Sequence, residues 1–267
     1  MLHIGFGKAS DPGRIRSNNE DATGCFIPRS KHEARSRGYL FAVADGVGGS
    51  DRGEVAAATA IEVVTREFAE CQEETLLIGL LPRLLQHANA AVHDCRLQPE
   101  YRGTGMATTL VACALRYNEA VVSHLGDSRC YLVRAGELRH VTRDHKPGGR
   151  RMLGLLSTSD GRGASMQHVL TKCLGPEMFV KPDTTCVTLV AGDVLILCTD
   201  GLHDELPENE IAEIASQTGK DAEAIAQELV GRAVECDGRD NTTAQVIQIR
   251  SVEMAASYRG RQYPVSA

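Results

Sequence analysis

The stretch FAVADGVGGS (residues 41–50) places four apolar residues directly before an aspartate and three glycines among the four residues after it. An apolar run of this length predicts a strand buried on both faces rather than a helix. Asp45 would then stand at the end of that strand, where Gly46 leaves the backbone open to a close neighbour. A plain Asp-Gly turn has the same pattern, so this stretch alone does not decide between a turn and a site.

Acidic residues recur at similar places along the chain. Asp200 lies at the end of an apolar run and Asp240 just before a strand. Asp127 lies after a glycine inside a strand-like segment, where either a hairpin turns or a carboxylate is directed toward a site. In chain order these acidic residues are Glu20 and Asp21 shortly after Arg16, Asp127 after Gly126, Asp200 after the run VLILCT, and Asp240 with Asn241 before the run AQVIQIR.

Length and charge limit the classes of protein that this sequence fits. With 267 residues and 42% hydrophobic content, the chain has enough apolar side chains for one large core, so we expect a single domain over residues 1–267. The net charge of −6 offers no basic surface for a phosphate backbone, which argues against nucleic acid as a partner.

The sequence also bears on the compartment. No apolar stretch approaches the length that a membrane-spanning helix needs, and the start of the chain lacks the apolar segment of a signal peptide. The nine cysteines form no Cys-x-x-Cys pair, and many lie inside apolar runs, as reduced core thiols do. We therefore expect a cytoplasmic protein without a membrane span.

The order of elements predicts an α+β fold. Residues 53–70 and 75–98 have helical spacing, with Pro82 as a break or kink in the second segment. Short strands follow over 107–141 as a meander, and residues 146–168 form an irregular excursion rich in Gly, Ser and Arg. Two further strands, two helices and a last strand complete the chain. Strands and helices that do not alternate one by one indicate antiparallel sheets covered by helices.

Carboxylates that gather at strand ends repel one another unless cations lie between them. Oxygen ligands without His or Cys favour hard ions, which here means Mg²⁺ or Mn²⁺. Two such ions about 3.5–4 Å apart activate a water for attack on phosphorus, while a guanidinium holds the phosphate oxygens. Arg16, shortly before Glu20 and Asp21, is the guanidinium that we expect in this role. Spacing alone does not show that these residues converge.

Taken together, the motifs resemble those of the metal-dependent Ser/Thr protein phosphatases of type 2C, over roughly residues 8 to 250. An ordered series of this length is far more specific than any one motif. The matching motifs are Arg16-Ser-Asn-Asn-Glu20-Asp21, Asp45-Gly-Val-Gly-Gly49, Gly103-Thr-Gly-Met-Ala-Thr-Thr109, Gly126-Asp-Ser-Arg129, Thr142-Arg-Asp-His145, Thr199-Asp-Gly-Leu202 followed by Asp204, and Asp240-Asn-Thr242.

The resemblance implies a four-layer α-β-β-α sandwich of two antiparallel sheets flanked by helices, with two tightly bound Mg²⁺ or Mn²⁺ ions and a weaker third one. It also implies a role for each matching residue. Asp45 would bridge the two metals, and Gly46 would lend its backbone carbonyl as a further ligand. Asp200 and Asp240 would hold one metal, Glu20 would bind the other through water, and Asp127 with Asp200 would form the third site. Asp21 and Asn241 would lie behind these ligands, and Arg16 would bind the phosphate.

The chain departs from the resemblance at one position. Some members of the family carry a histidine after the Asp-Gly pair, as a candidate proton donor to the leaving alkoxide, whereas this chain has Val47. His124, His145 and His203 remain as other histidines, although a lone histidine in or beside a strand is more often a packed residue than a catalytic one. The resemblance therefore leaves the proton donor open, with water as the simplest substitute.

Function follows from the resemblance as an expectation. The chain would be a monomeric phosphatase acting on phosphoserine and phosphothreonine of proteins, including a Ser/Thr kinase or its substrates. The excursion at 146–168 corresponds to a variable flap, where Arg150, Arg151 and Arg162 would select substrates. A dedicated regulator phosphatase for one small partner and a phosphoprotein-binding scaffold with little activity remain as alternatives. A divalent-metal nuclease fits the carboxylates but not the acidic charge balance.

Overall fold

Two five-stranded sheets form the centre of the molecule, and all their strand pairs are antiparallel. The computed structural model describes residues 2–47, 52–73, 75–146, 170–258 and 261–264. The first sheet has the order β1 (His3–Asp11), β10 (Thr242–Ser251), β9 (Val194–Cys198), β6 (Arg129–Arg134) and β7 (Glu137–His140). The second has the order β2 (Asp21–Phe26), β3 (Tyr39–Asp45), β4 (Leu110–Arg116), β5 (Glu119–Leu125) and β8 (Asp183–Thr188).

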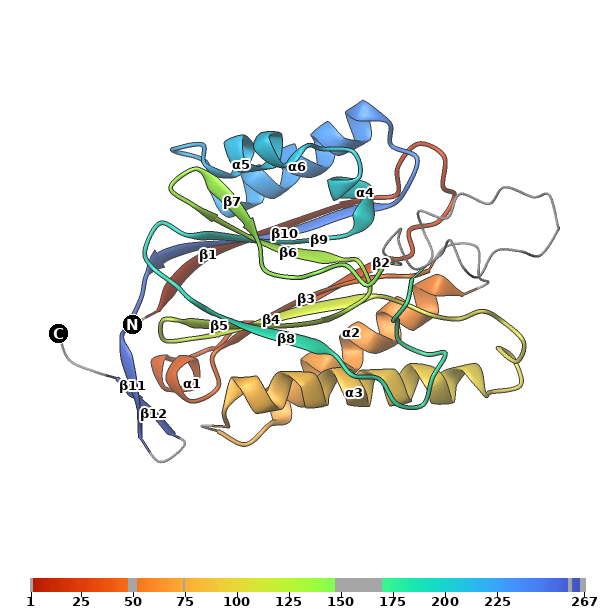
Figure 1. The fold of residues 1–267 in the computed structure, drawn as a ribbon, viewed down its shortest axis with the longest axis horizontal. Helices are drawn as coiled ribbons and strands as arrows, with labels where there is room; N and C mark the ends of the chain where they lie inside the picture. Colours follow the sequence, from red (N-terminus) through yellow and green to blue (C-terminus); the bar gives the residue numbers. More distant parts are fainter. Residues whose placement is uncertain (1, 48–51, 74, 147–169, 259–260, 265–267) are drawn as a thin grey trace, which may run out of the picture.

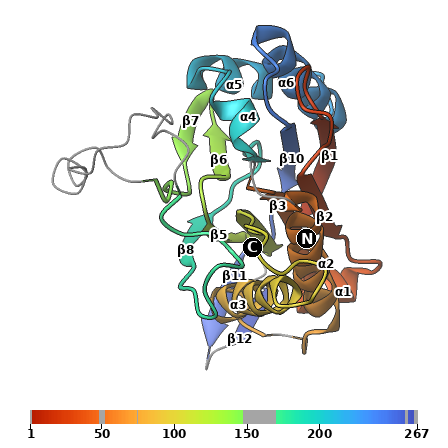
Figure 2. The same cartoon turned by 90° about the vertical axis from the view of Figure 1, so that its right-hand side faces the viewer.

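Helices cover the outer face of each sheet, which gives four layers (Figure 1). The second sheet is covered by α2 (Gly53–Glu70) and α3 (Leu77–Arg96), and the first by α5 (Glu208–Ala215) and α6 (Ala222–Cys236). Figure 2 shows the same order from one end, with α5 and α6 on one side of the sheets and α2 and α3 on the other. The remaining elements are the short helices α1 (Lys31–Ser36) and α4 (Asp200–His203) and a separate hairpin of β11 (Ala255–Tyr258) and β12 (Arg261–Pro264).

Each interface between layers has its own apolar core. Leu40, Ala42 and Ala44 of β3 pack against α2 and α3, while Phe41 and Val43 on its opposite face pack between the two sheets. The third core lies between the first sheet and the helices α4 to α6. Since successive strand residues point to opposite faces, a strand between two cores must be apolar throughout, as the run before Asp45 is.

The expected α+β sandwich is confirmed, with three differences in detail. The strands expected as one meander over 107–141 form two hairpins in different sheets, because β5 ends at Leu125 in the second sheet and β6 begins at Arg129 in the first. No hairpin therefore turns at Gly126. Of the break or kink expected at Pro82, the break is wrong, since α3 continues through this residue.

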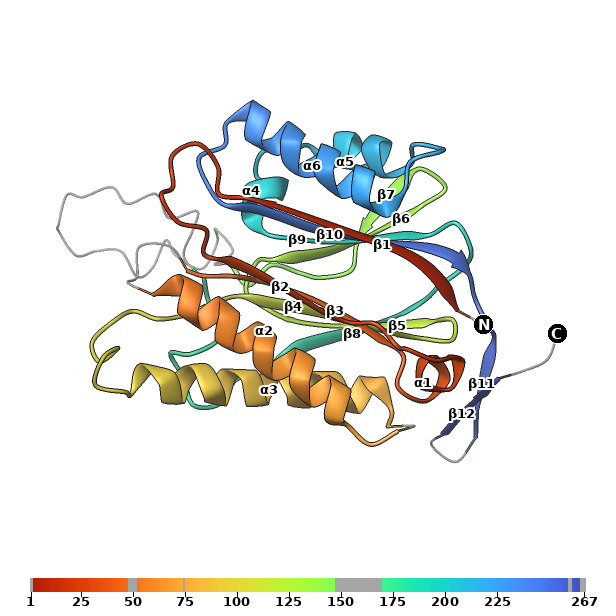
Figure 3. The ribbon, with the colours of Figure 1, turned by 180° about the vertical axis from the view of Figure 1, so that it is seen from behind.

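Strands β1 and β2 were not expected from the sequence. Figure 3 shows them from behind, with β1 beside β10 and β2 beside β3.

No helix in the described part of the chain is long and apolar enough to cross a bilayer.

Candidate active site

Five chain segments bring the acidic residues to one end of the two sheets. Residues 12–20 pass from β1 in the first sheet to β2 in the second and carry Arg16 and Glu20. Residues 126–128 make the opposite crossing from β5 to β6 and carry Asp127. The other three segments are the end of β3 at Asp45, the start of α4 at Asp200, and the residues Asp240 and Asn241 before β10.

The backbone of Asp45 is fixed from the neighbouring segment. Its carbonyl accepts hydrogen bonds from the Thr109 amide and the Thr108 hydroxyl, both at 2.8 Å, and its amide donates to Thr109 Oγ1 at 3.0 Å. Asp21 is its register partner on β2. The β3 end is therefore held rigidly, and the Asp45 carboxylate projects from a fixed position.

Asn241 holds the crossing segment that carries Arg16 and Glu20. Its amide nitrogen donates to the carbonyls of Pro12 and Asn18, both at 2.9 Å, and its Oδ1 accepts from the Glu20 amide at 2.8 Å. The side chain is buried, so these bonds are shielded from water. Asn241 thus positions the segment through its backbone.

A cavity of about 100 Å³ opens at this end of the sheets. It contains four of the five aspartates expected at the site, together with the expected guanidinium and glycine. Its lining residues are Arg16, Asp45, Gly46, Val47, Thr109, Asp127, Leu170, Asp200 and Asp240. Most of the lining residues are therefore among those that the sequence predicts for the site. Thr109 and Leu170 are not predicted individually, although Thr109 stands in a quoted motif.

Burial and mutual repulsion raise the pKa values of the central carboxylates. Burial is the larger cause for Asp45, whose pKa lies well above its usual value, and Asp200 and Asp21 add to it by repulsion. Burial likewise raises the pKa of Asp21 to about 7 and that of Asp200 to about 6. For Asp200, Asp127 is the main repelling group. The site thus concentrates negative charge that needs cations to remain ionised at neutral pH.

Two cations of the chain itself contact these carboxylates. Arg16 Nη2 donates to Asp240 Oδ2 at 2.7 Å, and Lys146 Nζ lies 2.9 Å from Asp127 Oδ2. Across the described ranges, no three acidic, His or Cys side chains are arranged as ligands of one metal ion. Two of the proposed ligands are instead turned toward a guanidinium and an ammonium.

Gly46 has a packing reason for its missing side chain. A Cβ atom there would lie 2.4 Å from the carbonyl carbon of Gly53, which is the first residue of α2. From the sequence we expect glycine here to let the main chain reach a metal, whereas close backbone packing at Gly46 alone already requires glycine. Gly48 and Gly49 lie outside the described residues.

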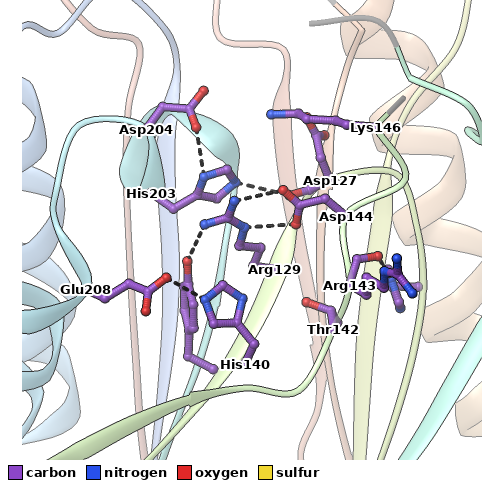
Figure 4. A network of polar contacts seen from close by, with 12 residues as sticks. Asp127, Arg129, His140, Thr142, Arg143, Asp144, Lys146, His203, Asp204 and Glu208 are labelled. Atoms are coloured by element: carbon purple, nitrogen blue, oxygen red, sulfur yellow. Dashed lines mark hydrogen bonds and ion pairs between the residues drawn. The ribbon is translucent and has the colours of Figure 1, made fainter. Parts of the chain in front are cut away.

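The three histidines belong to polar contacts around Asp127 and the turn before it. Figure 4 shows His203 beside Asp127. His203 Nε2 donates to the Asp127 carbonyl at 3.1 Å. His145 Nδ1 accepts from the Gly126 amide at 3.1 Å, and its ring stacks on that of His124 with 4.8 Å between centroids. None of the three is among the described residues that line the cavity. Their contacts agree with packed, positioning residues.

Arg129 and Asp144 form a second polar pair near Asp127. The guanidinium donates from Nε and Nη2 to the two carboxylate oxygens at 2.9 and 2.7 Å (Figure 4). Although burial raises the pKa of Asp144, these bonds lower it overall. The pair ties β6 to the segment before Lys146. Arg150, Arg151 and Arg162 lie outside the described residues.

Comparison with known sequences gives a consistent result. A profile of the family described as "Protein phosphatase 2C" matches residues 15–231. "Serine/threonine phosphatase stp" of Listeria monocytogenes is 31% identical over 246 residues, which span 90% of this chain and 93% of that protein. "Protein phosphatase PhpP" of Streptococcus pneumoniae is 28% identical over 243 residues, which span 90% of this chain and 95% of that protein.

Solved structures agree over nearly the whole chain. The serine/threonine phosphatase of S. agalactiae has a TM-score of 0.77 at 26% identity, covering 93% of this chain and 100% of that chain. The catalytic domain of PstP, in complex with two manganese ions, has a TM-score of 0.75 at 29% identity, covering 94% of this chain and 100% of that one. The similarity therefore extends over both sheets rather than over one motif.

Proposed function

The chain belongs to the protein phosphatase 2C family and is a protein serine/threonine phosphatase, and from this premise we propose that it works with two divalent ions, Mg²⁺ or Mn²⁺, at the carboxylate end of the sheets. The observation that carries the proposal is the convergence of Asp45, Asp127, Asp200 and Asp240 on one small cavity that also contains Arg16. The two manganese ions of the PstP structure support the stoichiometry.

The residues present fit such ions. The donors are carboxylate oxygens and a backbone carbonyl, which hard divalent ions prefer. Asp21 Oδ1 is buried and has no hydrogen-bond partner in the described part of the chain, while Asp21 Oδ2 accepts from Thr199 Oγ1 at 2.9 Å. We propose that Asp45, Asp200, Asp240, Glu20 and the Gly46 carbonyl hold the two ions, directly or through water, with Asp21 and Asn241 behind them.

When bound, the ions would neutralise the carboxylates and supply Lewis-acid activation of water for attack on phosphorus. The chain's own residues do the positioning. Arg16 binds the phosphate oxygens, and because only one of its nitrogens donates to Asp240, its other N–H groups remain for a phosphate. Val47 lines the cavity and has no acidic proton, so the proton that the leaving alkoxide takes up comes from water.

The proposed substrates are phosphoserine and phosphothreonine monoesters in proteins, and the proposed role is to oppose a Ser/Thr kinase in signalling. We further propose a single, monomeric domain over residues 1–267 with substrate choice in the 146–168 segment, through Arg150, Arg151 and Arg162. All nine cysteines are free thiols, which supports a cytoplasmic location. A dedicated phosphatase for one small partner protein remains the second candidate for its biological role.

Hydrolysis of phosphopeptides tests the proposal directly. The chain is freed of metal by exhaustive chelation, checked by elemental analysis, and phosphate release is measured before and after addition of Mn²⁺ or Mg²⁺. We expect turnover to vanish without metal and to return with either ion. Undiminished turnover of the metal-free protein would contradict the proposed mechanism, whereas a panel of phosphoproteins would separate a general from a dedicated phosphatase.

A further inference from the structure

Lys146 forms an ion pair with Asp127, a contact that the sequence does not predict. Its Nζ lies 2.9 Å from Asp127 Oδ2, with the Lys146 side chain 22% exposed and the Asp127 side chain 5% exposed. Figure 4 shows the two side chains beside each other, with His203 and Asp204 nearby. The ion pair is thus largely removed from water, where charges attract one another more strongly than at the surface.

Several carboxylates attract the ammonium at this position. Burial lowers the pKa of Lys146, but the hydrogen bond and charge of Asp127, together with the charges of Asp204 and Asp200, raise it overall. Asp200 and Asp127 also repel each other, because Asp127 is the main charge that raises the pKa of Asp200. The ammonium therefore lies in the field that would attract a divalent ion to this pair.

The backbone of Asp127 is fixed independently of Lys146. His203 donates to its carbonyl at 3.1 Å, and the preceding Gly126 exchanges hydrogen bonds with His145. Ser128, which follows, has its hydroxyl 2.6 Å from Thr109 Oγ1. Removing the lysine should consequently leave the Asp127 backbone in place and change mainly the counter-charge of its carboxylate.

We infer that Lys146 is a built-in counter-ion of Asp127 that competes with a divalent ion for this carboxylate. This inference rests on the proposed metal centre and deepens it. A third ion that uses Asp127 and Asp200 binds only when the ammonium leaves, so Lys146 weakens that site relative to the two others. Lys146 is accordingly a positioning residue that sets metal affinity, and it need not touch the substrate.

Binding of Mn²⁺ to the full-length chain tests this competition. Free Mn²⁺ is measured by electron paramagnetic resonance during titration of wild type, K146Q and K146R, and isothermal calorimetry gives the affinities. We expect the weakest ion to bind roughly tenfold more tightly to K146Q, because a repelling and competing unit charge is lost. The affinities of the two tighter ions should change much less, since only the more distant charge of Asp200 links them to Lys146. K146R, which keeps the charge, should bind the weakest ion no more tightly than wild type does.

A double-mutant cycle assigns the effect to Asp127. In the D127N background, K146Q should change Mn²⁺ binding by less than about twofold, since the contested carboxylate is absent. An effect of full size in the D127N background would overturn the inference. It would also be overturned if K146Q bound the weakest ion no more tightly than wild type, or if K146Q did not bind a third ion at all.

Thermal unfolding verifies that each variant is folded, and Lys146→Met serves as a second neutral variant. The count of tight ions keeps the two proposals separate. If wild type holds no tight Mn²⁺, the proposed metal centre is wrong and the competition falls with it. If two tight ions are present and the affinity of the weakest site does not change when Lys146 is replaced, only the proposed competition is wrong.

Discussion

Asp45 combines a fixed backbone with a carboxylate in a crowded electrostatic environment. Hydrogen bonds from Thr108 and Thr109 hold the peptide groups on both sides of its Cα atom, and none of these bonds uses the side chain. Its carboxylate, by contrast, is buried among other acidic groups. A change confined to the side chain therefore alters the chemistry of the site with little effect on β3.

Asp45→Asn should lower kcat for a phosphopeptide by several powers of ten, because the variant loses the oxygen charge proposed to bridge two metals. Loss of about a thousandfold corresponds to roughly 4 kcal/mol in the barrier. Steady-state kinetics in saturating Mn²⁺ provide the measurement. Retention of more than about a tenth of kcat, a loss below ~1.4 kcal/mol, would show that Asp45 is not the bridge.

Asp221→Asn is a matched control for that substitution. Asp221 caps α6 by accepting from the Ala224 amide at 2.9 Å, and asparagine caps a helix about equally well. It lies outside the cavity, so the control should retain wild-type kcat and stability. A similar fall in both variants would indicate a general effect of losing one carboxylate charge.

At the scale of elements, the site depends on segments that change sheets. β1 and β2 follow each other in sequence but belong to different sheets, as do β5 and β6. Each crossing leaves an irregular backbone at the same end of the sandwich, and one carries Arg16 and Glu20 while the other carries Asp127. Chain crossings therefore carry Arg16, Glu20 and Asp127 of the proposed site, and the paired strands provide the scaffold that holds them.

Residues 146–168 are proposed to select substrates and to take no part in the hydrolysis itself. Replacing their three arginines by serine (R150S/R151S/R162S) should leave kcat/KM for a small aryl phosphate within a few fold, because no proposed metal ligand is changed. The ranking of several phosphoproteins should change, since only large substrates reach beyond the cavity. These rate constants are measured for both proteins on one small substrate and the phosphoprotein panel. A fall of all of them by one common factor would place the arginines in the catalytic machinery instead.

The sequence predicts strands best where both faces are buried. β3 and β9 are predicted by their continuous apolar runs. β1 has no such run, because it contains glycines at positions 5 and 7 and its residues are not buried consecutively. Gly7 is required by its neighbour, because a Cβ there would lie 2.2 Å from the Glu223 amide of α6. Contacts between residues that far apart cannot be read from local pattern.

The same limit applies to the site. The ordered motifs identified the aspartates and Arg16, since each carries its own local signature beside a glycine or a strand end. Lys146 and Leu170 gave no signal, because their place at the site depends on how the chain crosses from one sheet to the other. The packing of Gly46 on Gly53 was missed for the same reason.

For the whole molecule, the buried carboxylates link stability to pH. The pKa values of Asp21 and Asp200 are about 7 and about 6 in the folded chain, against a usual value near 3.8, and that of Asp45 is also raised. Between about pH 4 and pH 7 the folded state consequently binds more protons than the unfolded state. The protonated carboxyls contribute fully to stability below about pH 4, and this contribution is lost as pH rises through the folded pKa values.

We expect the free energy of unfolding of the metal-free chain, measured by urea titration in chelator, to fall between pH 5.5 and pH 8. Saturating Mn²⁺ should remove much of that fall, because it neutralises the same carboxylates. Asp21→Asn should flatten the profile in chelator and stabilise the chain at pH 8 by about 1 kcal/mol or more. A free energy that is constant or rising over this range, or an unchanged profile in Asp21→Asn, would contradict the assignment.

The pairing of β1 with β10 has a consequence for how the protein is made. His3 to Asp11 find their register partners only at Thr242 to Ser251, and the crossing that carries Arg16 is clamped by Asn241. A ribosome adds about 5–20 residues each second, so the first strand waits for roughly ten seconds or longer before its partner is synthesised. Until then its edge lies open and the aspartates cannot assemble, so each newly made molecule becomes active only once nearly all of this chain has emerged.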